Sequence, residues 1–226
     1  MPKDTFLNLP EDKRRRILSL AIEAFAEDDY KNVSISELVR RAGIAKGSFY
    51  QYFEDKQDLY LHLIDLAGQE KSRFLAENPP PEDAAGTFEY LRWLYAVGVR
   101  FEFANPRLAQ IAYRAVFGDA PLPSETRRVL EESSQGFFRD LVRRGQAEGH
   151  LRPEIDPDLA AFVFNTVFTN LGGYLLDRLD LNPQDLRKQL DRQNNPEAER
   201  LFSAVIDLLE HGMAPPTSRR RIKKTP

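Results

Sequence analysis

The segment from residue 33 to residue 56 restricts the possible folds of this chain more than any other. Ser34 is a good N-cap residue, and Glu37, three residues later, can return a hydrogen bond to it, so a capping box predicts a helix from about Ile35. Gly43 ends this helix, because glycine adopts the left-handed conformation that other residues resist. The segment therefore predicts two short helices on either side of a glycine turn.

The second of these helices, from Lys46 to Phe53, has a polar face and an apolar face. In helix-turn-helix proteins the front of the second helix contacts base edges in double-stranded DNA, so Lys46, Gly47 and Ser48 are predicted base contacts. Tyrosine hydroxyls and a lysine can bind phosphate oxygens. The predicted DNA-binding residues are Ser34, Ser36, Lys46, Gly47, Ser48, Tyr50, Gln51, Tyr52 and Lys56.

A wider pattern consists of Leu38, Val39, Ala42, Gly43, Ile44, Ala45, Gly47, Tyr50, Tyr52, Phe53, Lys56 and Leu59. It resembles the DNA-binding signature of the TetR family of one-component bacterial repressors, and the resemblance covers roughly Glu11 to Lys71. Two residues depart from the family pattern. Val39 crowds the helix crossing, and Ala45 removes the usual N-cap of the second helix, a loss of about 1 kcal/mol. We therefore expect the helices of the N-terminal DNA-binding domain, called the head below, to be held together somewhat less firmly.

Two observations leave room for a plainer interpretation. A glycine turn with a nearby tyrosine also occurs in an ordinary helical hairpin, although the capping box, the turn glycine, the tyrosines and the first helix agree with one another. The net charge is −3 with a pI of about 5.8, and residues 1–60 hold ten Lys and Arg against eleven Asp and Glu. A positive face must come from local clusters, namely Lys13–Arg16, Arg40, Arg41 and Lys46.

Other classes of protein are disfavoured. The chain has no cysteine, and its three histidines (His62, His150 and His211) are widely separated, so we expect neither a metal site nor a cofactor. No nucleophile and base form a recognisable motif, which argues against an enzyme. The sequence lacks a long apolar stretch and an apolar signal core, so we expect a cytoplasmic protein with no membrane partner.

Beyond residue 77 the proline pattern predicts a second helical region, and the fold class is all-α with about nine helices. The helices are expected from about 81 or 82 to 104, from 106 to 118, from the loop at Pro121 and Pro123 to 149, from 157 onward, and from 196 to 211. The predicted domains are a helix-turn-helix domain (1–54), a connecting helix (55–77), a ligand-binding and dimerisation domain (78–214) and a disordered basic tail (215–226). A surface loop is expected at 180–196.

The helix that begins at Pro157 is apolar on more than one side, so it needs more than one packing partner. The resemblance implies that this helix and the last one form a four-helix bundle with a second copy of the chain. Such a homodimer would place two heads on a palindromic operator. The predicted interface residues are Phe164, Phe168, Leu171, Leu175, Leu201, Val205 and Leu208. The alternative is that both helices are simply core.

The resemblance also implies an apolar cavity for a small hydrophobic effector. The predicted pocket residues are Trp93, Phe101, Tyr113, Arg114, Phe117, Phe138, Asn165 and Phe168, with Asn170 as a further polar candidate. A surface arginine and hydrogen-bonded core asparagines are the alternative explanation of the polar members. An effector that moves the connecting helix, held by Leu59, Leu63 and Leu66, would lower operator affinity by linkage.

The leading prediction is therefore a dimeric transcriptional repressor that a small hydrophobic molecule releases from its operator. A helical small-molecule carrier that does not bind an operator is the alternative, and an enzyme is the weakest of the three.

Overall fold

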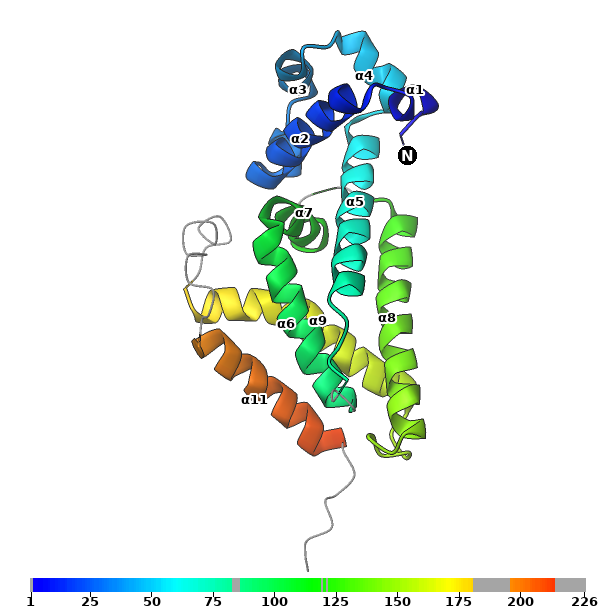
Figure 1. Cartoon of the computed structure of the whole chain (residues 1–226), viewed down its shortest axis with the longest axis vertical. Coiled ribbons are helices and arrows are strands. Elements are labelled where there is room, and N and C mark those ends of the chain that lie inside the picture. Colours follow the sequence, from blue (N-terminus) through cyan, green and yellow to red (C-terminus); the bar gives the residue numbers. More distant parts are fainter. Residues whose placement is uncertain (1, 83–85, 119, 121, 181–195, 214–226) are drawn as a thin grey trace, which may run out of the picture. The chain divides into compact units, whose positions relative to one another are not determined.

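The computed structural model describes residues 2–82, 86–118, 120, 122–180 and 196–213. These residues form ten α-helices, one short 3-10 helix and no strand (Figure 1). The elements are α1 (Asp4–Leu7), α2 (Glu11–Glu27), η1 (Tyr30–Asn32), α3 (Ile35–Ala42), α4 (Lys46–Tyr52), α5 (Lys56–Glu77), α6 (Thr87–Ala104), α7 (Pro106–Phe117), α8 (Ser124–Ala147), α9 (Pro157–Arg178) and α11 (Pro196–Met213).

The predicted all-α class is confirmed, and most helix ends lie within a few residues of their predicted positions. Two differences are clear. The sequence analysis missed α1, and α6 begins at Thr87 rather than at Pro81 or Glu82. Most of the predicted loop at 180–196 and the whole predicted tail at 215–226 lie outside the described residues.

The chain divides into two compact units. The first contains the described residues of Met1–Pro79 and Tyr95–Arg128, and the second those of Pro80–Leu94, Val129–Leu181 and Arg192–Pro226. The first unit thus includes α7, which the sequence analysis assigned to the ligand-binding domain. Helices α6 and α8 each contribute residues to both units.

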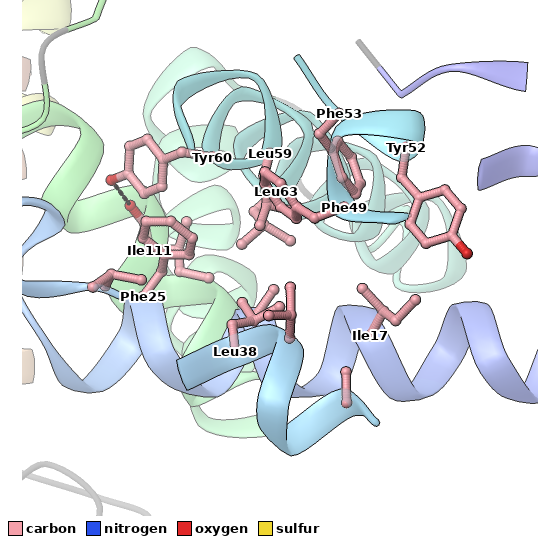
Figure 2. Close-up of a cluster of buried hydrophobic side chains, with 14 of the residues drawn as sticks. Ile17, Phe25, Leu38, Phe49, Tyr52, Phe53, Leu59, Tyr60, Leu63 and Ile111 are labelled. Carbon is pink, nitrogen blue, oxygen red and sulfur yellow. Dashed lines mark hydrogen bonds between the residues drawn. The ribbon is translucent and has the colours of Figure 1, made fainter. Parts of the chain in front are cut away.

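The core of the first unit joins α1 to α5 with α7 (Figure 2). Each large apolar side chain that is fully buried in this core contributes about 1.5–3 kcal/mol to the free energy of folding. The Tyr60 hydroxyl of α5 also donates a hydrogen bond to the Ile111 carbonyl of α7, at 3.4 Å. Core residues shown in Figure 2 are Ile17, Phe25, Leu38, Phe49, Phe53, Leu59, Tyr60, Leu63 and Ile111.

Local signals fix the helix ends within this unit. Gly43 ends α3 in the left-handed conformation, with φ of 69°, as the sequence predicts. Asp55 caps α5 by accepting from the Asp58 backbone N–H at 2.8 Å, and the Asp58 carboxylate accepts from the Glu54 N–H at 3.1 Å. The first bond satisfies an N–H group in the first turn of α5, and the second holds the backbone just before the cap.

The second unit has an aromatic core and a polar link between helices. Phe138 of α8 packs against Phe168 of α9, with ring centroids 5.5 Å apart. Arg92 of α6 pairs with Asp207 at 2.8 Å and with Glu210 at 3.1 Å, both on α11. The unit is therefore held by a buried aromatic cluster and by one arginine with two carboxylates.

None of the described helices is both long and apolar enough to cross a membrane. In the described ranges, no three His, Cys, Asp or Glu side chains gather in a way that would hold a metal ion.

Candidate nucleic-acid interface

Helix α3 begins at the N-cap that the sequence predicts. The Ser34 hydroxyl accepts from the Glu37 backbone N–H at 3.3 Å. The other half of the predicted capping box is replaced, because the Glu37 carboxylate binds Arg40 through two hydrogen bonds of 2.5 and 2.8 Å. The Arg40 guanidinium thereby lowers the pKa of Glu37. Ser34 and Ser36 are both exposed at the start of α3, where the prediction placed them.

Helix α4, the predicted DNA-reading helix, presents its front to solvent. Lys46 and Gly47 are exposed and Ser48 is half-buried, while Tyr50 and Gln51 are exposed further along the helix. Phe49 and the following Phe53 are 1% and 0% exposed and hold α4 against the core. The predicted base contacts therefore lie together on one accessible end of the helix.

The fold itself does not require a glycine at position 47. A Cβ atom built there would meet no protein atom within 4 Å, and the backbone is helical. Glycine inside a helix is about 1 kcal/mol less favourable than alanine. The side-chain-free surface at Gly47 is thus a feature that costs stability and leaves room for an approaching molecule.

The structure corrects the position predicted for Tyr52. Its side chain is 6% exposed, and its ring lies 5.8 Å from that of Phe6. Figure 2 shows the ring at the edge of the cluster, with its hydroxyl directed away from Phe49 and Phe53. Tyr52 is therefore mainly a core residue, because the last turn of α4 rotates it toward α1, whereas Tyr50 is 48% exposed.

The structure shows contacts of Lys56 within the protein that the sequence did not predict. Its ammonium group donates to the carbonyl oxygens of Tyr30, Lys31 and Val33, at 2.8, 3.3 and 3.1 Å. It also lies 4.5 Å from the centre of the Tyr30 ring. An ammonium group has three donors, so all three are used within the protein. Lys56 joins the start of α5 to the segment that leads into α3, and its contact with a phosphate stays a prediction.

Several predicted basic residues also have partners within the head. Arg41 pairs with Glu23 of α2 at 2.5 Å, in addition to the Arg40–Glu37 pair described above. Arg14 donates to the Leu7 carbonyl at 2.7 Å. Local positive charge on this face therefore comes less from α3 than the sequence indicated, and Lys46 is the predicted base contact that carries a charge.

The sequence analysis missed α1 altogether, although this helix contacts the C-terminal end of α4. The Lys3 ammonium donates to the Tyr50 carbonyl at 3.1 Å, and the Lys3 backbone N–H donates to the Tyr52 carbonyl at 2.9 Å. The Thr5 hydroxyl donates to the Gln51 carbonyl. A helix of four residues carries no periodic pattern, so no sequence signal pointed to these contacts.

Helix α7 binds the head through arginines. Arg114, predicted as a pocket residue, pairs instead with Asp29 at 2.6 Å and donates to the Glu27 carbonyl at 3.4 Å. Arg107 pairs with the carboxylates of Glu27 at 3.4 Å and Glu23 at 3.6 Å. The Arg114 side chain is 12% exposed, which agrees neither with a surface arginine nor with one that is free to orient a ligand.

The other predicted pocket residues are divided between the two units, and their role as a pocket stays a prediction. Phe101 and Tyr113 belong to the first unit, whereas Trp93, Phe138, Asn165 and Phe168 belong to the second. The Phe117 side chain lies outside the described residues. Asn165 accepts from Ser134 of α8 at 2.5 Å, and Asn170 donates to the Thr166 carbonyl at 2.8 Å, so both asparagines have partners within the second unit.

Two open surface hollows lie away from the predicted pocket residues. One lies at Asn105–Leu108, and the other lies between α2 and Leu66.

The predicted dimer residues fall into two groups. Phe164, Leu171 and Leu175 are 0%, 5% and 7% exposed, so they are buried within their own chain. Phe168, Leu201 and Val205 are half-buried, whereas Leu208 is 75% exposed. Three further apolar residues of α9 follow the helical repeat that predicts a buried face, and the structure shows them exposed. They are Leu159, Phe162 and Tyr174. Periodicity alone does not say which of two apolar stripes faces the core.

Comparisons with known proteins match both parts of the chain. Residues 17–63 match the model "Bacterial regulatory proteins, tetR family", and residues 85–214 match "Tetracyclin repressor-like, C-terminal domain". The transcriptional repressor KstR of Mycobacterium tuberculosis is 30% identical over 182 residues, which cover 80% of this chain and 78% of that protein.

Solved structures of TetR family regulators also resemble this chain. A TetR family transcriptional regulator from Chloroflexus aurantiacus is 50% identical, with a TM-score of 0.76 over 94% of this chain and 98% of that one. The regulator TylP of Streptomyces fradiae is 25% identical, with a TM-score of 0.57 over 91% and 88% of the two chains. The matched domains and relatives are transcriptional regulators rather than enzymes. This chain therefore belongs to the TetR family of bacterial regulatory proteins.

Proposed function

We propose that this protein is a cytoplasmic repressor that binds a palindromic DNA operator as a homodimer and leaves it when a small hydrophobic effector binds. Regulators of this family bind operator DNA and typically act as homodimers with small-molecule effectors. KstR is a transcriptional repressor, which supports repression rather than activation.

The observation that carries the DNA-binding proposal is the open front of α4 at Gly47. Lys46 and Gly47 are exposed, and none of the described residues occupies the space that a Cβ of residue 47 would take. Base edges are read at close range by the first residues of such a helix. A glycine that the fold does not need, beside an exposed lysine, fits a surface that meets the major groove.

A Gly47→Ala variant tests this proposal directly. We expect it to be as stable as the wild type or up to about 1 kcal/mol more stable, because alanine favours the helix. Its affinity for operator DNA should fall by about tenfold, because a mismatch at one base position costs about 1–3 kcal/mol. The DNA is a duplex that the wild-type protein selects from a random pool, and binding is followed by fluorescence anisotropy.

Gly68→Ala is the matched control. Gly68 is exposed on α5 and a Cβ there also meets nothing within 4 Å. This variant should share any gain in stability and keep wild-type affinity. If the wild-type protein selects no sequence from the pool, the operator-binding proposal is wrong and the carrier alternative gains support.

The effector proposal draws on Trp93 of α6. Its indole N–H is buried and has no hydrogen-bond partner within the described residues, whereas buried tryptophan usually finds one. Its ring packs 5.0 Å from that of Tyr90. A bound molecule with an oxygen acceptor and an apolar body would supply the missing partner.

Trp93 is the only tryptophan in the chain, so its fluorescence reports on its surroundings without a label. A panel of hydrophobic molecules would be titrated while the emission of Trp93 and the anisotropy of bound operator DNA are both recorded. We expect an effector to change the emission and release the DNA over the same concentration range. A molecule that changes the emission at saturation yet leaves operator affinity unchanged would argue against its being an effector.

A further inference from the structure

We infer that α1 is a positioning element for DNA recognition, which holds the C-terminal end of α4 so that the front of α4 reads bases in a fixed orientation. This inference rests on the proposed operator binding and adds to it a set of residues that do not themselves contact the bases. The residues are Lys3, Thr5 and Phe6, and we call them the α1 clamp.

Helix α4 needs support at its ends. It has only seven residues, and its N-cap position, Ala45, makes no side-chain hydrogen bond. Isolated helices of this length are unstable in water, because nucleation is costly and few hydrogen bonds repay it. The four carbonyls at the end of any helix also lack partners within it. Because α4 lacks a side-chain N-cap, its stability depends more on contacts at its C-terminal end.

The α1 clamp supplies these contacts. The Phe49 carbonyl accepts from the Phe53 N–H at 2.9 Å, and the next three carbonyls of α4 are each bound by α1. Tyr50 receives the Lys3 ammonium, Gln51 the Thr5 hydroxyl and Tyr52 the Lys3 backbone N–H. Cations near a helix C-terminus also interact favourably with its dipole. The last three carbonyls of α4 are thus satisfied by Lys3 and Thr5, which lie more than forty residues earlier in the chain.

Phe6 holds the clamp in place. Its side chain is 0% exposed, and its ring lies 4.7 Å from that of Phe53 and 6.2 Å from that of His62 on α5. Arg14 of α2 binds the Leu7 carbonyl at the end of α1. The clamp is therefore held by both α2 and α5. Because these two helices fix its position, the clamp in turn fixes the orientation of α4.

This arrangement has a consequence for specificity. Contacts to base edges depend on placing side chains to within about half an ångström, whereas attraction to phosphates tolerates small shifts. A loosened α4 should lose affinity for the operator and keep its affinity for random DNA. The clamp should therefore raise the ratio of the affinity for the operator to the affinity for random DNA.

Thr5→Val tests the clamp with little change of shape and none of charge. We expect the backbone amides of α4 to exchange hydrogen about threefold faster, because one hydrogen bond contributes about 0.5–1.5 kcal/mol. Thr5→Ser, which keeps the hydroxyl, should restore the wild-type rate. Leu7→Ala is the control on the same helix, because the Leu7 side chain is 48% exposed and the hydrogen bonds to α4 described above come from Lys3 and Thr5. Exchange in α4 that is equal in Thr5→Val and the wild type would overturn the inference.

The second measurement uses the selected operator duplex and a scrambled duplex, each at several salt concentrations. Thr5→Val should bind the operator about threefold to tenfold more weakly and the scrambled duplex equally well, with an unchanged salt slope. Lys3→Met should show the same loss if Lys3 acts through α4. A salt slope reduced by about one would instead identify Lys3 as a phosphate contact and overturn its place in the clamp.

The two measurements separate the possible failures. If the wild-type protein binds no DNA specifically, the proposed function fails, while the exchange data still decide whether α1 holds α4. If the wild type binds its operator and Thr5→Val retains both affinities, the proposed function stands and the positioning role is wrong.

Discussion

Lys56, a residue of the DNA-binding motif, makes hydrogen bonds that stabilise the fold. Its ammonium group binds three backbone carbonyls between Tyr30 and Val33. A Lys56→Met variant keeps much of the apolar stem and loses all three bonds. We expect the free energy of unfolding to fall by about 2 kcal/mol, since hydrogen bonds to charged groups contribute about 1.5–3 kcal/mol when buried and these are partly exposed. Unfolding in urea would measure it.

Lys46→Met is the matched comparison for Lys56→Met. Lys46 is exposed at the front of α4, so its loss should change the free energy of unfolding by less than about 0.5 kcal/mol and should weaken operator binding. The loss of Lys56 should thus lower the free energy of unfolding, whereas the loss of Lys46 should weaken operator binding. Equal stability of the Lys56→Met variant and the wild type would show that its carbonyl contacts contribute nothing in solution.

His62 gives the head a pH dependence whose sign follows from burial. Its Nδ1 atom is buried without a partner in the described residues, and burial lowers the pKa of its imidazole from the ordinary 6.5, although Asp65 and Asp58 partly oppose this. The unfolded chain therefore binds a proton at a higher pH than the folded chain does. Stability from this group is complete above about pH 6.5 and is lost as the pH falls toward the lower folded pKa.

A His62→Gln variant removes this titration. Urea unfolding of the wild type and the variant at pH 7.5 and pH 5.5 should show a smaller acid loss of stability in the variant. The comparison is made within each protein, so a uniform cost of the substitution does not affect it. An acid loss that is equal in both proteins would mean that His62 does not titrate between these pH values on unfolding.

At the scale of elements, α7 is joined to the head by two arginines that differ in burial. In the pair of Arg114 with Asp29 the arginine is 12% exposed and the aspartate 55% exposed, whereas Arg107 and Glu27 are 42% and 49% exposed in theirs. The two pairs therefore differ in the burial of the arginine. Exposed pairs contribute about 0–1 kcal/mol, and shielding from water strengthens the interaction. Helix α7 should therefore be held to the end of α2 mainly through Arg114.

Double-mutant cycles can test this difference. We expect a coupling energy of about 1 kcal/mol between Arg114→Met and Asp29→Ala, and less than about 0.5 kcal/mol between Arg107→Met and Glu27→Ala. The free energy of unfolding of each single and double variant supplies the two values. The reverse order would show that side-chain burial does not govern these contacts.

The elements also show what the sequence could and could not predict. Gly43, Ser34 and the prolines are local signals, and they placed most helix ends correctly. The bonds of Lys56 to Tyr30 and of Lys3 to Tyr50 join residues that are 26 and 47 positions apart, and they bind backbone carbonyls that any residue supplies. No pattern of residue types records such a contact. Tyr52 was misplaced for a related reason, since its burial depends on α1.

At the scale of the whole molecule, exposed apolar residues on the second unit support the proposed homodimer. Leu159, Phe162 and Tyr174 on α9 are 60%, 58% and 50% exposed, and Leu208 on α11 is 75% exposed. The α9 residues are spaced so that they lie along one face of the helix. Of the interface residues predicted from sequence, Leu208 is the exposed one, so we propose an interface that includes it together with the α9 residues.

A Leu208→Arg variant would test this interface. An unpaired charge in a desolvated contact costs about 3–5 kcal/mol, so the variant should shift from dimer to monomer at micromolar concentration, as measured by sedimentation. Leu7→Arg places the same charge on an exposed leucine of α1 and should remain dimeric. Two heads on one dimer bind a palindrome together, whereas a monomer binds each half-site alone, so the Leu208→Arg variant should also lose most of its operator affinity. A variant that stays dimeric would place the interface elsewhere. One that becomes monomeric and still binds the full operator as tightly as the wild type would show that DNA recognition does not need the dimer.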